Sequence, residues 1–305
     1  MDLKYFTADA FTREAFHGAQ IAVFPEAEAL TAVQMQTIAA EFNLSETVFV
    51  TAVEGSVGFH ARAFSPREEV PVFGHSLIAT AHVIVSSGLF DLPDGVHDLQ
   101  MHCGERVTPL AVATRNGQAE QAQFAVTVTP TVDRFVPPRS ELASFLSLSV
   151  DDLDAPDDLR SLLVACPKPY LVVAVKNRDA ARRARFDFGK WSNSSAPSML
   201  AQEILLVATG AEHHDAQFYA RLVGPAIGVN DDPPVGVALP ALAAWLCDHP
   251  HIRKGTYPFA VERGSRETRH SLLNIEMDNQ GKEVLQLRIG GNAVLVCEGR
   301  MTLPR

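Results

Sequence analysis

Glu46 is the first side chain whose type and surroundings suggest chemistry. A polar break at 43–45 precedes it, and the β-branched and aromatic run 47–50 that follows predicts a strand. A carboxylate at the mouth of an apolar strand is costly to bury as an anion unless it is paired or serves as an acid or base. The structural alternative is an ordinary solvated charge. Glu46 is therefore a candidate general base whose role depends on the rest of the chain.

His75 is the second such side chain. It follows Gly74 at the start of the run 74–89, which is apolar nearly all round and predicts a central buried helix. Glycine lets the backbone approach a ligand, and an imidazole titrates near neutral pH. The alternative is a core histidine, or a plain helix start that Ser76 caps.

Asp232 is the third. With Asp231 it precedes two prolines and the apolar run 236–246, which predicts a second buried helix. The prolines fix the path of the loop and limit the movement of the carboxylate. The alternative is a pair of acids that complement the helix dipole. If Asp232, His75 and Glu46 lie in one cleft, these three side chains could transfer protons to and from a substrate.

Composition and charge exclude several classes of function. The chain has 305 residues, 47% of them hydrophobic, and a net charge of −10, which predicts a well-packed protein whose main partner is neither nucleic acid nor an anionic membrane surface. No segment reaches the roughly 18 apolar residues that span a bilayer, and the first residues lack the basic and apolar regions of a secretory signal. We therefore expect a cytoplasmic protein with a small-molecule substrate.

Cofactor and metal motifs are missing from the sequence. There is no P-loop, no G-x-G-x-x-G after a strand, and no G-x-S-x-G elbow. The four cysteines are far apart with no C-x-x-C, which favours buried free thiols over disulfides. His213, His214 and Asp215 are the only compact ligand-like group, but adjacent histidines of a strand point to opposite faces, so we expect no metal there.

Strand and helix patterns alternate along both halves of the chain. The first half predicts helices at 31–42 and 74–89 and strands at 3–11, 18–24, 47–52, 57–64, 99–103, 106–113 and 118–128, with a hairpin turn at Asn116-Gly117. The second half predicts helices at 140–146, 156–163, 178–189 and 236–246 and strands at 170–175, 203–209, 216–222, 270–276, 284–289 and 293–298. The proline-rich segment 129–139 between them is the expected domain boundary.

The two halves echo each other. In each, an alternating strand with an Ala-Arg pair, Ala61-Arg62 or Ala220-Arg221, leads through a proline-bearing loop to an apolar helix near a glycine, Gly74 or Gly236. Two such α+β halves related by a pseudo-dyad would direct two helix N-termini toward one cleft. Free N–H groups and the positive end of the helix dipole there suit a carboxylate.

Several stretches resemble the phenazine-biosynthesis isomerase (PhzF-like) family, which shares the diaminopimelate epimerase fold. They are DAFTREAFHGAQIAVF at 9–24, MQTIAAEFNLSETVFV at 35–50, FSPREEVPVFGHSLIATA at 64–81, the segment 219–246 and RIGGNAVLVCEG at 288–299. The resemblance implies an α+β protein of two pseudo-symmetric domains, 1–128 and 129–305, with the last strand able to return to the first domain. Each domain would be a mostly antiparallel sheet wrapped around a central apolar helix.

The resemblance also implies the roles of individual residues. Glu46 of NLSET would be the catalytic acid/base, with His75 and Asp232 as its catalytic partners, no cofactor and frequently a homodimer. The substrate-binding positions that it implies are Gly18, Gly74, Ser76, Gly236 and Val237.

The anchoring motifs depart from the family pattern. The G-N-P of the first loop is Gly18-Ala19-Gln20, G-H-P is Gly74-His75-Ser76, and E-D-P-A-T-G-S is 231–237, DDPPVGV. Two side-chain hydroxyls are thereby replaced by Val235 and Val237. A hydrogen bond to a charged group contributes about 1.5–3 kcal/mol, so these changes indicate a different substrate or a different way of holding it. The paired cysteine bases of the related epimerases are also missing from both helix starts.

Three hypotheses follow. The first is a cofactor-independent isomerase in which Glu46 moves a proton on a small polar or carboxylate-bearing metabolite. The second is a binding or interaction protein that keeps the fold and has altered chemistry, which the valines and the changed G-N-P motif motivate. The third is a lyase or racemase acting on an amino acid.

Overall fold

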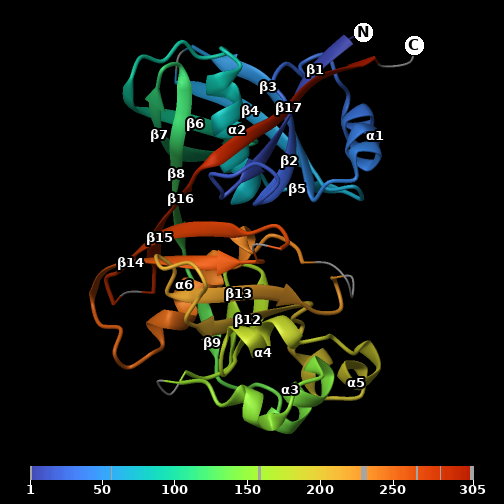
Figure 1. Cartoon of the computed structure of the whole chain (residues 1–305), viewed down its shortest axis with the longest axis vertical. Coiled ribbons are helices and arrows are strands. Elements are labelled where there is room, and N and C mark those ends of the chain that lie inside the picture. The colour runs from blue at the N-terminus through green and yellow to red at the C-terminus, as the bar shows by residue number, and fades with distance from the viewer. Residues whose placement is uncertain are drawn as a thin grey trace. The chain divides into compact units, whose positions relative to one another are not determined.

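The computed structural model describes residues 2–55, 57–156, 159–227, 232–265, 267–281 and 283–302, so Asp231 lies outside the described residues. The fold is α+β and divides into two compact units (Figure 1). Unit 1 comprises the described residues of 2–126, 265–273 and 288–302. Unit 2 comprises those of 127–264 and 274–287.

The last strand lies in unit 1, a return to the first domain that the sequence analysis allowed for. Strand β17 (Ala293–Thr302) belongs to unit 1, because it pairs antiparallel along the whole of β1 (Asp2–Ala10), from Asp2 opposite Thr302 to Ala10 opposite Ala293. Figure 1 shows this red strand beside the blue β1. The strands β15 (Ser271–Asn279) and β16 (Leu285–Gly291) each cross the division.

Unit 1 is built on mostly antiparallel strand pairs. Its other strands are β2 (Ala19–Phe24), β3 (Glu46–Glu54), β4 (Gly58–Phe64), β5 (Glu69–Val70), β6 (Gly95–Cys103), β7 (Arg106–Arg115) and β8 (Gln118–Val128). The pairs β2–β3 and β4–β6 are parallel, and β1–β2, β3–β4, β4–β5, β6–β7 and β7–β8 are antiparallel. Asn116 and Gly117, at φ 53° and 73°, form the β7–β8 turn, which confirms the expected hairpin.

Two helices cover the strands of unit 1. Helix α2 (His75–Ser86) is buried from His75 to Val85 and contacts β1, β2, β3 and β17, as its apolar sequence predicts. Helix α1 (Ala32–Phe42) contacts β3 and β4. A capping box starts it, in which the Thr31 side chain accepts from the Gln34 N–H and the Gln34 side chain accepts from the Thr31 N–H. Its apolar face completes a cluster with Phe24, Phe49 and Phe64.

His82 joins α2 to β17. Its Nδ1 lies 2.9 Å from the Ile78 carbonyl oxygen and therefore donates, while its Nε2 accepts from the Ala293 N–H at 3.1 Å. The side chain is fully buried, and this burial lowers the pKa of His82, with the carbonyls of Ile78 and Glu120 opposing the shift. His82 is thus a neutral structural histidine rather than a catalytic one.

We expect acid to destabilise the protein through His82. Its folded pKa lies below the ordinary value of about 6.5, so the unfolded chain binds the proton more readily. The stability that neutral His82 contributes is fully present above the unfolded pKa of about 6.5 and is lost as the pH falls toward the folded pKa. Urea unfolding between pH 7.5 and 5 should show a free energy of unfolding that decreases with falling pH. His82→Gln should reduce the slope of this dependence. The control His97→Gln, at a half-buried histidine whose Nε2 lies 2.8 Å from the Pro93 carbonyl oxygen, should keep the slope. An unchanged slope in His82→Gln would assign it to other groups.

Unit 2 combines a mixed set of strands with short helices. Its strands are β9 (Thr131–Asp133), β10 (Leu162–Ala165), β11 (Pro169–Ala174), β12 (Glu203–Thr209), β13 (Phe218–Val223) and β14 (Gly255–Arg263). Its helices are α3 (Arg139–Leu146), α4 (Arg178–Arg183), α5 (Phe188–Ser192) and α6 (Leu239–Cys247), with 3₁₀ turns at Val150–Leu153, Ala196–Met199 and Gly236–Ala238. The pairs β9–β10, β10–β11 and β12–β13 are antiparallel, and β11–β12 and β13–β14 are parallel.

Helix α6 is buried from Leu239 to Leu246 and contacts β10 and β11, whereas α4 contacts β12 and β13. Among the described residues, no helix combines the length and apolar character needed to cross a membrane.

Several predicted elements of unit 2 are wrong. The expected helix at 156–163 is replaced by β10, because 162–165 pairs with both β9 and β11. The expected helix 178–189 is two short helices, since Ala184 leaves helical geometry at ψ 134°. Strand β14 was not predicted at all. Local sequence does not define β9 or β10; pairing with neighbouring strands does.

Candidate active site

Glu46 is the first residue of β3. Asn43 ends α1 in the left-handed conformation, at φ 49° and ψ 34°, and turns the chain after the helix. Parallel pairing with β2 then sets Glu46 beside Ile21. The residue is 8% exposed, so it does not face bulk solvent. The polar break that the sequence shows before Glu46 is therefore the turn that delivers the carboxylate to the strand end.

His75 is the first residue of α2, and its side chain is 4% exposed. The residue before it, Gly74, has φ 60° and ψ −115°, a conformation open to glycine and strained for other residues. The tight turn at Gly74 sets the ring at the helix start, where the first backbone N–H groups have no partner within the helix.

The two side chains meet. Glu46 Oε1 lies 3.2 Å from His75 Nε2. The mutual orientation does not satisfy hydrogen-bond geometry, and in the described part of the chain Glu46 Oε2 and both His75 ring nitrogens have no hydrogen-bond partner. We therefore describe the contact as a close ion pair rather than a directed hydrogen bond. A buried carboxylate and imidazole with unused polar atoms can exchange protons with a molecule bound beside them.

Ser76 and Gly18, two of the predicted substrate-binding residues, both make hydrogen bonds within unit 1. The Ser76 hydroxyl accepts from the Phe73 N–H at 3.1 Å and donates to the Phe73 carbonyl at 3.0 Å, so it fixes the turn before α2. The Gly18 N–H donates to the His270 carbonyl at 2.7 Å. A Cβ at Gly18 would lie 2.3 Å from the Ala10 oxygen, so this position needs glycine for packing.

A buried carboxylate that the sequence analysis missed orders the 11–18 loop. Asp9 is 1% exposed and accepts from the Phe16 N–H at 2.7 Å and from Arg269 Nη1 at 2.7 Å. Arg269 also donates to the His17 carbonyl and to Gln20 Oε1. The signal for Asp9 was an acid inside an apolar strand, but its partner is 260 positions away.

Asp232 lies in unit 2 beside two arginines that were not predicted. Its Oδ2 is 3.4 Å from Arg263 Nε, and its Oδ1 is 3.9 Å from Arg221 Nε. Arg221 also donates to the carbonyls of residues 181, 182 and 184 at the end of α4. Burial lowers the pKa of Arg221, and Asp232 opposes that shift. Arg221, of the Ala220-Arg221 pair in the second half, therefore has its guanidinium beside the carboxylate of Asp232.

The segment after Asp232 enters the core of unit 2. Val235 is 1% exposed and Gly236 is buried, whereas Val237 is half-buried. Gly236 begins a 3₁₀ turn that leads into α6. Val235 is thus a core residue of this unit. Glu46, His75, Gly74 and Ser76 lie in unit 1, whereas Asp232, Gly236 and Val237 lie in unit 2.

His213, His214 and Asp215 lie in the turn between β12 and β13 rather than in a strand, so the reason given above for setting them aside was wrong. Their ligand atoms lie within 4.8 Å of one another. Asp215 oxygens approach His213 Nδ1 to 3.8 Å and His214 Nε2 to 3.3 Å. Surface pairing of histidine with aspartate accounts for this geometry.

The cysteines are less buried than expected. Only Cys166 is buried; Cys103 and Cys247 are half-buried, and Cys297 is exposed. All four are free thiols. Burial raises the pKa of both Cys166 and Cys247 to about 11, so these two are neutral at physiological pH and poor candidates for thiolate bases.

Comparison with known proteins now decides the family. The model of the PhzC-PhzF family, phenazine biosynthesis-like proteins, matches residues 8–299. The chain belongs to the PhzC-PhzF family.

Members of the PhzC-PhzF family match over nearly the full length. An uncharacterized isomerase of Mesorhizobium japonicum is 28% identical over 313 residues, covering 98% of each chain. The trans-2,3-dihydro-3-hydroxyanthranilate isomerase of Pseudomonas aeruginosa is 27% identical over 305 residues, covering 98% of this chain and 99% of its own.

Solved structures show the same fold. A phenazine biosynthesis protein of the PhzF family from Bacillus anthracis superposes with a TM-score of 0.84, at 22% identity, covering 99% of this chain and all of its own. A probable proline racemase from Agrobacterium radiobacter reaches a TM-score of 0.63 at 10% identity, covering 99% of this chain and 93% of its own. The fold is therefore shared beyond the PhzC-PhzF family.

We expect Gly74→Ala to destabilise this PhzC-PhzF protein by about 1–3 kcal/mol, because alanine is strained at φ 60° and ψ −115°. The strain would also displace His75 from Glu46. Thermal unfolding measures the first effect and activity the second. Gly189→Ala, within the short helix α5, is the matched control and should be neutral or slightly stabilising. Equal melting temperatures for wild type and Gly74→Ala would contradict the prediction.

Proposed function

We propose that the protein is a cofactor-independent isomerase in which Glu46 removes a proton from one carbon of a small metabolite and returns it to another. The carboxylate gains the proton in the first half of the reaction and loses it in the second, so the net change is a shift of one C–H bond. His75 would polarise the substrate or relay the proton. The close Glu46–His75 pair, with its 3.2 Å contact in a buried setting, is the observation that carries this proposal.

The backbone supports a site for an anionic group beside the pair. Helix α2 begins at His75, and its free N–H groups and positive dipole end favour a carboxylate. Because the Ser76 hydroxyl is already bonded to Phe73, we assign the binding to backbone N–H groups near Gly74. This arrangement matches a small polar or carboxylate-bearing substrate.

A second part of the proposal concerns unit 2. The strands β2, β3, β4 and β6 and the strands β11, β12, β13 and β14 show the same order of parallel, antiparallel and parallel pairing. In each set a buried helix, α2 or α6, lies in the chain before the last strand. This echo supports pseudo-symmetric units wrapped around central helices. We infer that Asp232 takes part in catalysis and that Gly236 and Val237 take part in substrate binding.

Relatives support the reaction class and suggest a first substrate. Those named above are an isomerase of unspecified reaction and a trans-2,3-dihydro-3-hydroxyanthranilate isomerase. At 27–28% identity the substrate itself need not be shared, and Val235 and Val237 replace the hydroxyl side chains expected at this helix start. Trans-2,3-dihydro-3-hydroxyanthranilate is therefore the first compound to test, followed by other cyclic and open-chain hydroxy and amino carboxylates.

The test is turnover in D₂O followed by NMR. We expect the product to carry deuterium at the carbon that receives the proton, because protonated Glu46 exchanges with solvent before returning it. Glu46→Gln should form product at least about 100-fold more slowly than wild type. Product formed by Glu46→Gln at the wild-type rate would overturn the mechanism. If no compound of the panel is converted, the isomerase assignment fails.

The alternative is a binding or interaction protein with altered chemistry. A solvent-facing Glu46 would have favoured it, but Glu46 is 8% exposed. The catalytic reading is therefore the better supported of the two.

The assembly and location are parts of the same proposal. A homodimer would elute at about 66 kDa, twice the 33.1 kDa of one chain, in size-exclusion chromatography with light scattering. A cytoplasmic location is likewise proposed rather than derived from the fold.

A further inference from the structure

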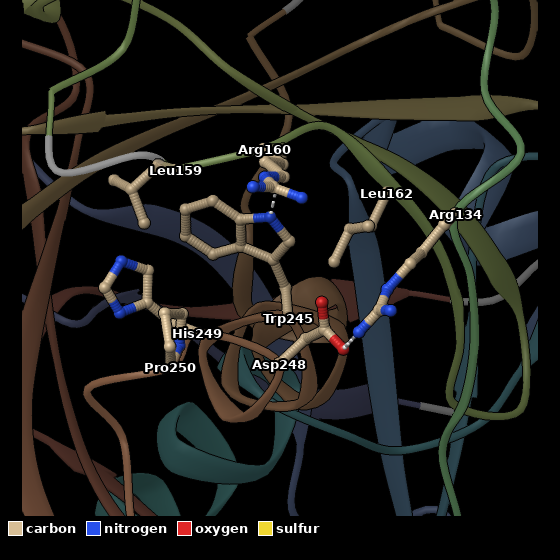
Figure 2. Close-up of a pocket in the computed structure, with 8 residues that line it drawn as sticks. All are labelled: Arg134, Leu159, Arg160, Leu162, Trp245, Asp248, His249 and Pro250. Carbon is tan, nitrogen blue, oxygen red and sulfur yellow. Dashed lines mark hydrogen bonds and ion pairs between the residues drawn. The ribbon is translucent and has the colours of Figure 1, made fainter.

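Unit 2 contains a cavity of about 270 Å³ near the C-terminal end of α6 (Figure 2). Its lining comes from the segment after β9, from the chain around the start of β10 and from the residues that follow α6. Glu46, His75 and Asp232 are not among its lining residues, so the proton chemistry proposed above does not account for it. The volume lies near the lower end of the range for small-molecule sites, which suits a ligand of one ring.

One wall of the cavity is apolar and rigid. It is formed by the Trp245 indole with Leu159 and Leu162. The indole Nε1 donates to the Arg160 backbone carbonyl at 2.7 Å, which satisfies its only donor and fixes the ring plane. Figure 2 shows the indole at the centre, with the two leucines on either side of it. Trp245 is 2% and Leu162 3% exposed, so the cavity meets only the edge of this fixed apolar wall, and that edge can contact the ring of a ligand.

The rest of the lining is cationic. Arg134 Nη2 pairs with Asp248 Oδ1 at 2.9 Å, so these two charges balance each other. Arg160 lines the same cavity, and its guanidinium has no carboxylate partner in the part of the chain that the structure describes. Within the described lining, Arg160 therefore adds a positive charge, in a chain whose net charge is −10. An uncompensated guanidinium beside an apolar wall attracts an anion against the global field.

His249 adds a directional polar group to this lining. Its Nδ1 accepts from the His251 N–H at 3.3 Å. The cavity thus presents an apolar wall with an arginine and an imidazole.

We propose that this cavity is a second small-molecule site, which binds a single-ring carboxylate. The ring lies against Trp245 and the leucines, and the carboxylate accepts hydrogen bonds from the Arg160 guanidinium. The proposal does not depend on the isomerase mechanism, because it shares no residue with the Glu46–His75 pair.

The test uses tryptophan fluorescence of the full chain. The protein has two tryptophans, so Trp191→Phe leaves Trp245 as the only reporter. We expect benzoate to cause a saturable change, and benzyl alcohol and inorganic phosphate to bind at least about tenfold more weakly. Arg160→Gln in this background should weaken benzoate binding by about 10- to 100-fold, because it removes hydrogen bonds to a charged group. The Trp245 bond is made to the Arg160 backbone, so the ring stays in place.

Arg253→Gln is the matched control, since Arg253 is exposed in the same unit and does not line the cavity. It should bind benzoate as the parent does. The proposal is overturned if benzoate causes no saturable change, if phosphate binds as tightly as benzoate, or if both arginine variants lose the same affinity. Thermal melts of both variants should match the parent, and a lower melting temperature for Arg160→Gln alone would assign Arg160 a structural role instead.

Discussion

Glu46→Gln should lower kcat by about 10²- to 10⁴-fold, the usual contribution of a positioned acid or base. Glutamine keeps the shape of the side chain and its contact with His75 but cannot take a proton. Because substrate contacts are retained, we expect KM to change little, so that kcat and kcat/KM fall together. Steady-state kinetics with the substrate found in the panel measures both quantities.

Glu54→Gln is the matched control for this prediction. Glu54 is the last residue of the same strand, β3, and pairs at the surface with His60 at 2.8 Å. The hydrogen bond with His60 lowers the pKa of Glu54, with the charges of His60 and His102 adding to the effect. Glu54→Gln should keep wild-type kinetics. A Glu46→Gln enzyme within fivefold of wild type would show that another group transfers the proton.

Asp9→Ala should reduce the free energy of unfolding by about 3 kcal/mol, the lower end of the range for breaking a buried ion pair. Asp9 is 1% exposed, and its loss removes the acceptor of the Phe16 N–H and the charged acceptor of the Arg269 guanidinium, which keeps His17 O and Gln20 Oε1. Arg269 is 35% exposed, so water can replace part of that interaction. Urea unfolding at neutral pH measures the change.

Asp94→Ala separates the effect of burial from the loss of a backbone hydrogen bond. Asp94 also accepts a backbone N–H, from Asn116 at 2.6 Å, but it is exposed. We expect it to cost about 1 kcal/mol or less. Asp9→Asn keeps an acceptor for the Phe16 N–H, so its loss in free energy of unfolding should lie between those of Asp9→Ala and Asp94→Ala. A loss below 1 kcal/mol for Asp9→Ala would mean that the 11–18 loop does not depend on this carboxylate.

Elements with a strong internal period could be predicted from the sequence. The apolar run after Gly74 predicted α2, and Asn116-Gly117 predicted the β7–β8 hairpin, because in both cases the signal is local. Strands β9 and β10 could not be predicted, since they are short and are defined by pairing with neighbours. Strand β14 has no alternating pattern and contains Pro258, which weakens its signal.

The candidate site could likewise be predicted only where the sequence signal is local. The side chains of Glu46 and His75 could be named because each stands at a visible boundary between a polar break and an apolar run. The internal use of Ser76 depends on a turn geometry that sequence does not specify. The partner of Asp9 and the arginines beside Asp232 are distant in sequence, so only the folded chain identifies them.

The pairing of β1 with β17 affects how the protein folds during synthesis. Strand β1 is made long before one of its two neighbours, β17, because the paired positions Asp2 and Thr302 lie 300 residues apart in the sequence. Until then one edge of β1 has unpaired N–H and C=O groups, and such an edge can pair with other chains. Domains usually fold in order from the N-terminus as they are made. In this protein the unit that carries Glu46 is complete only after β17 has been made, so its nascent chain is expected to need protection from aggregation until then.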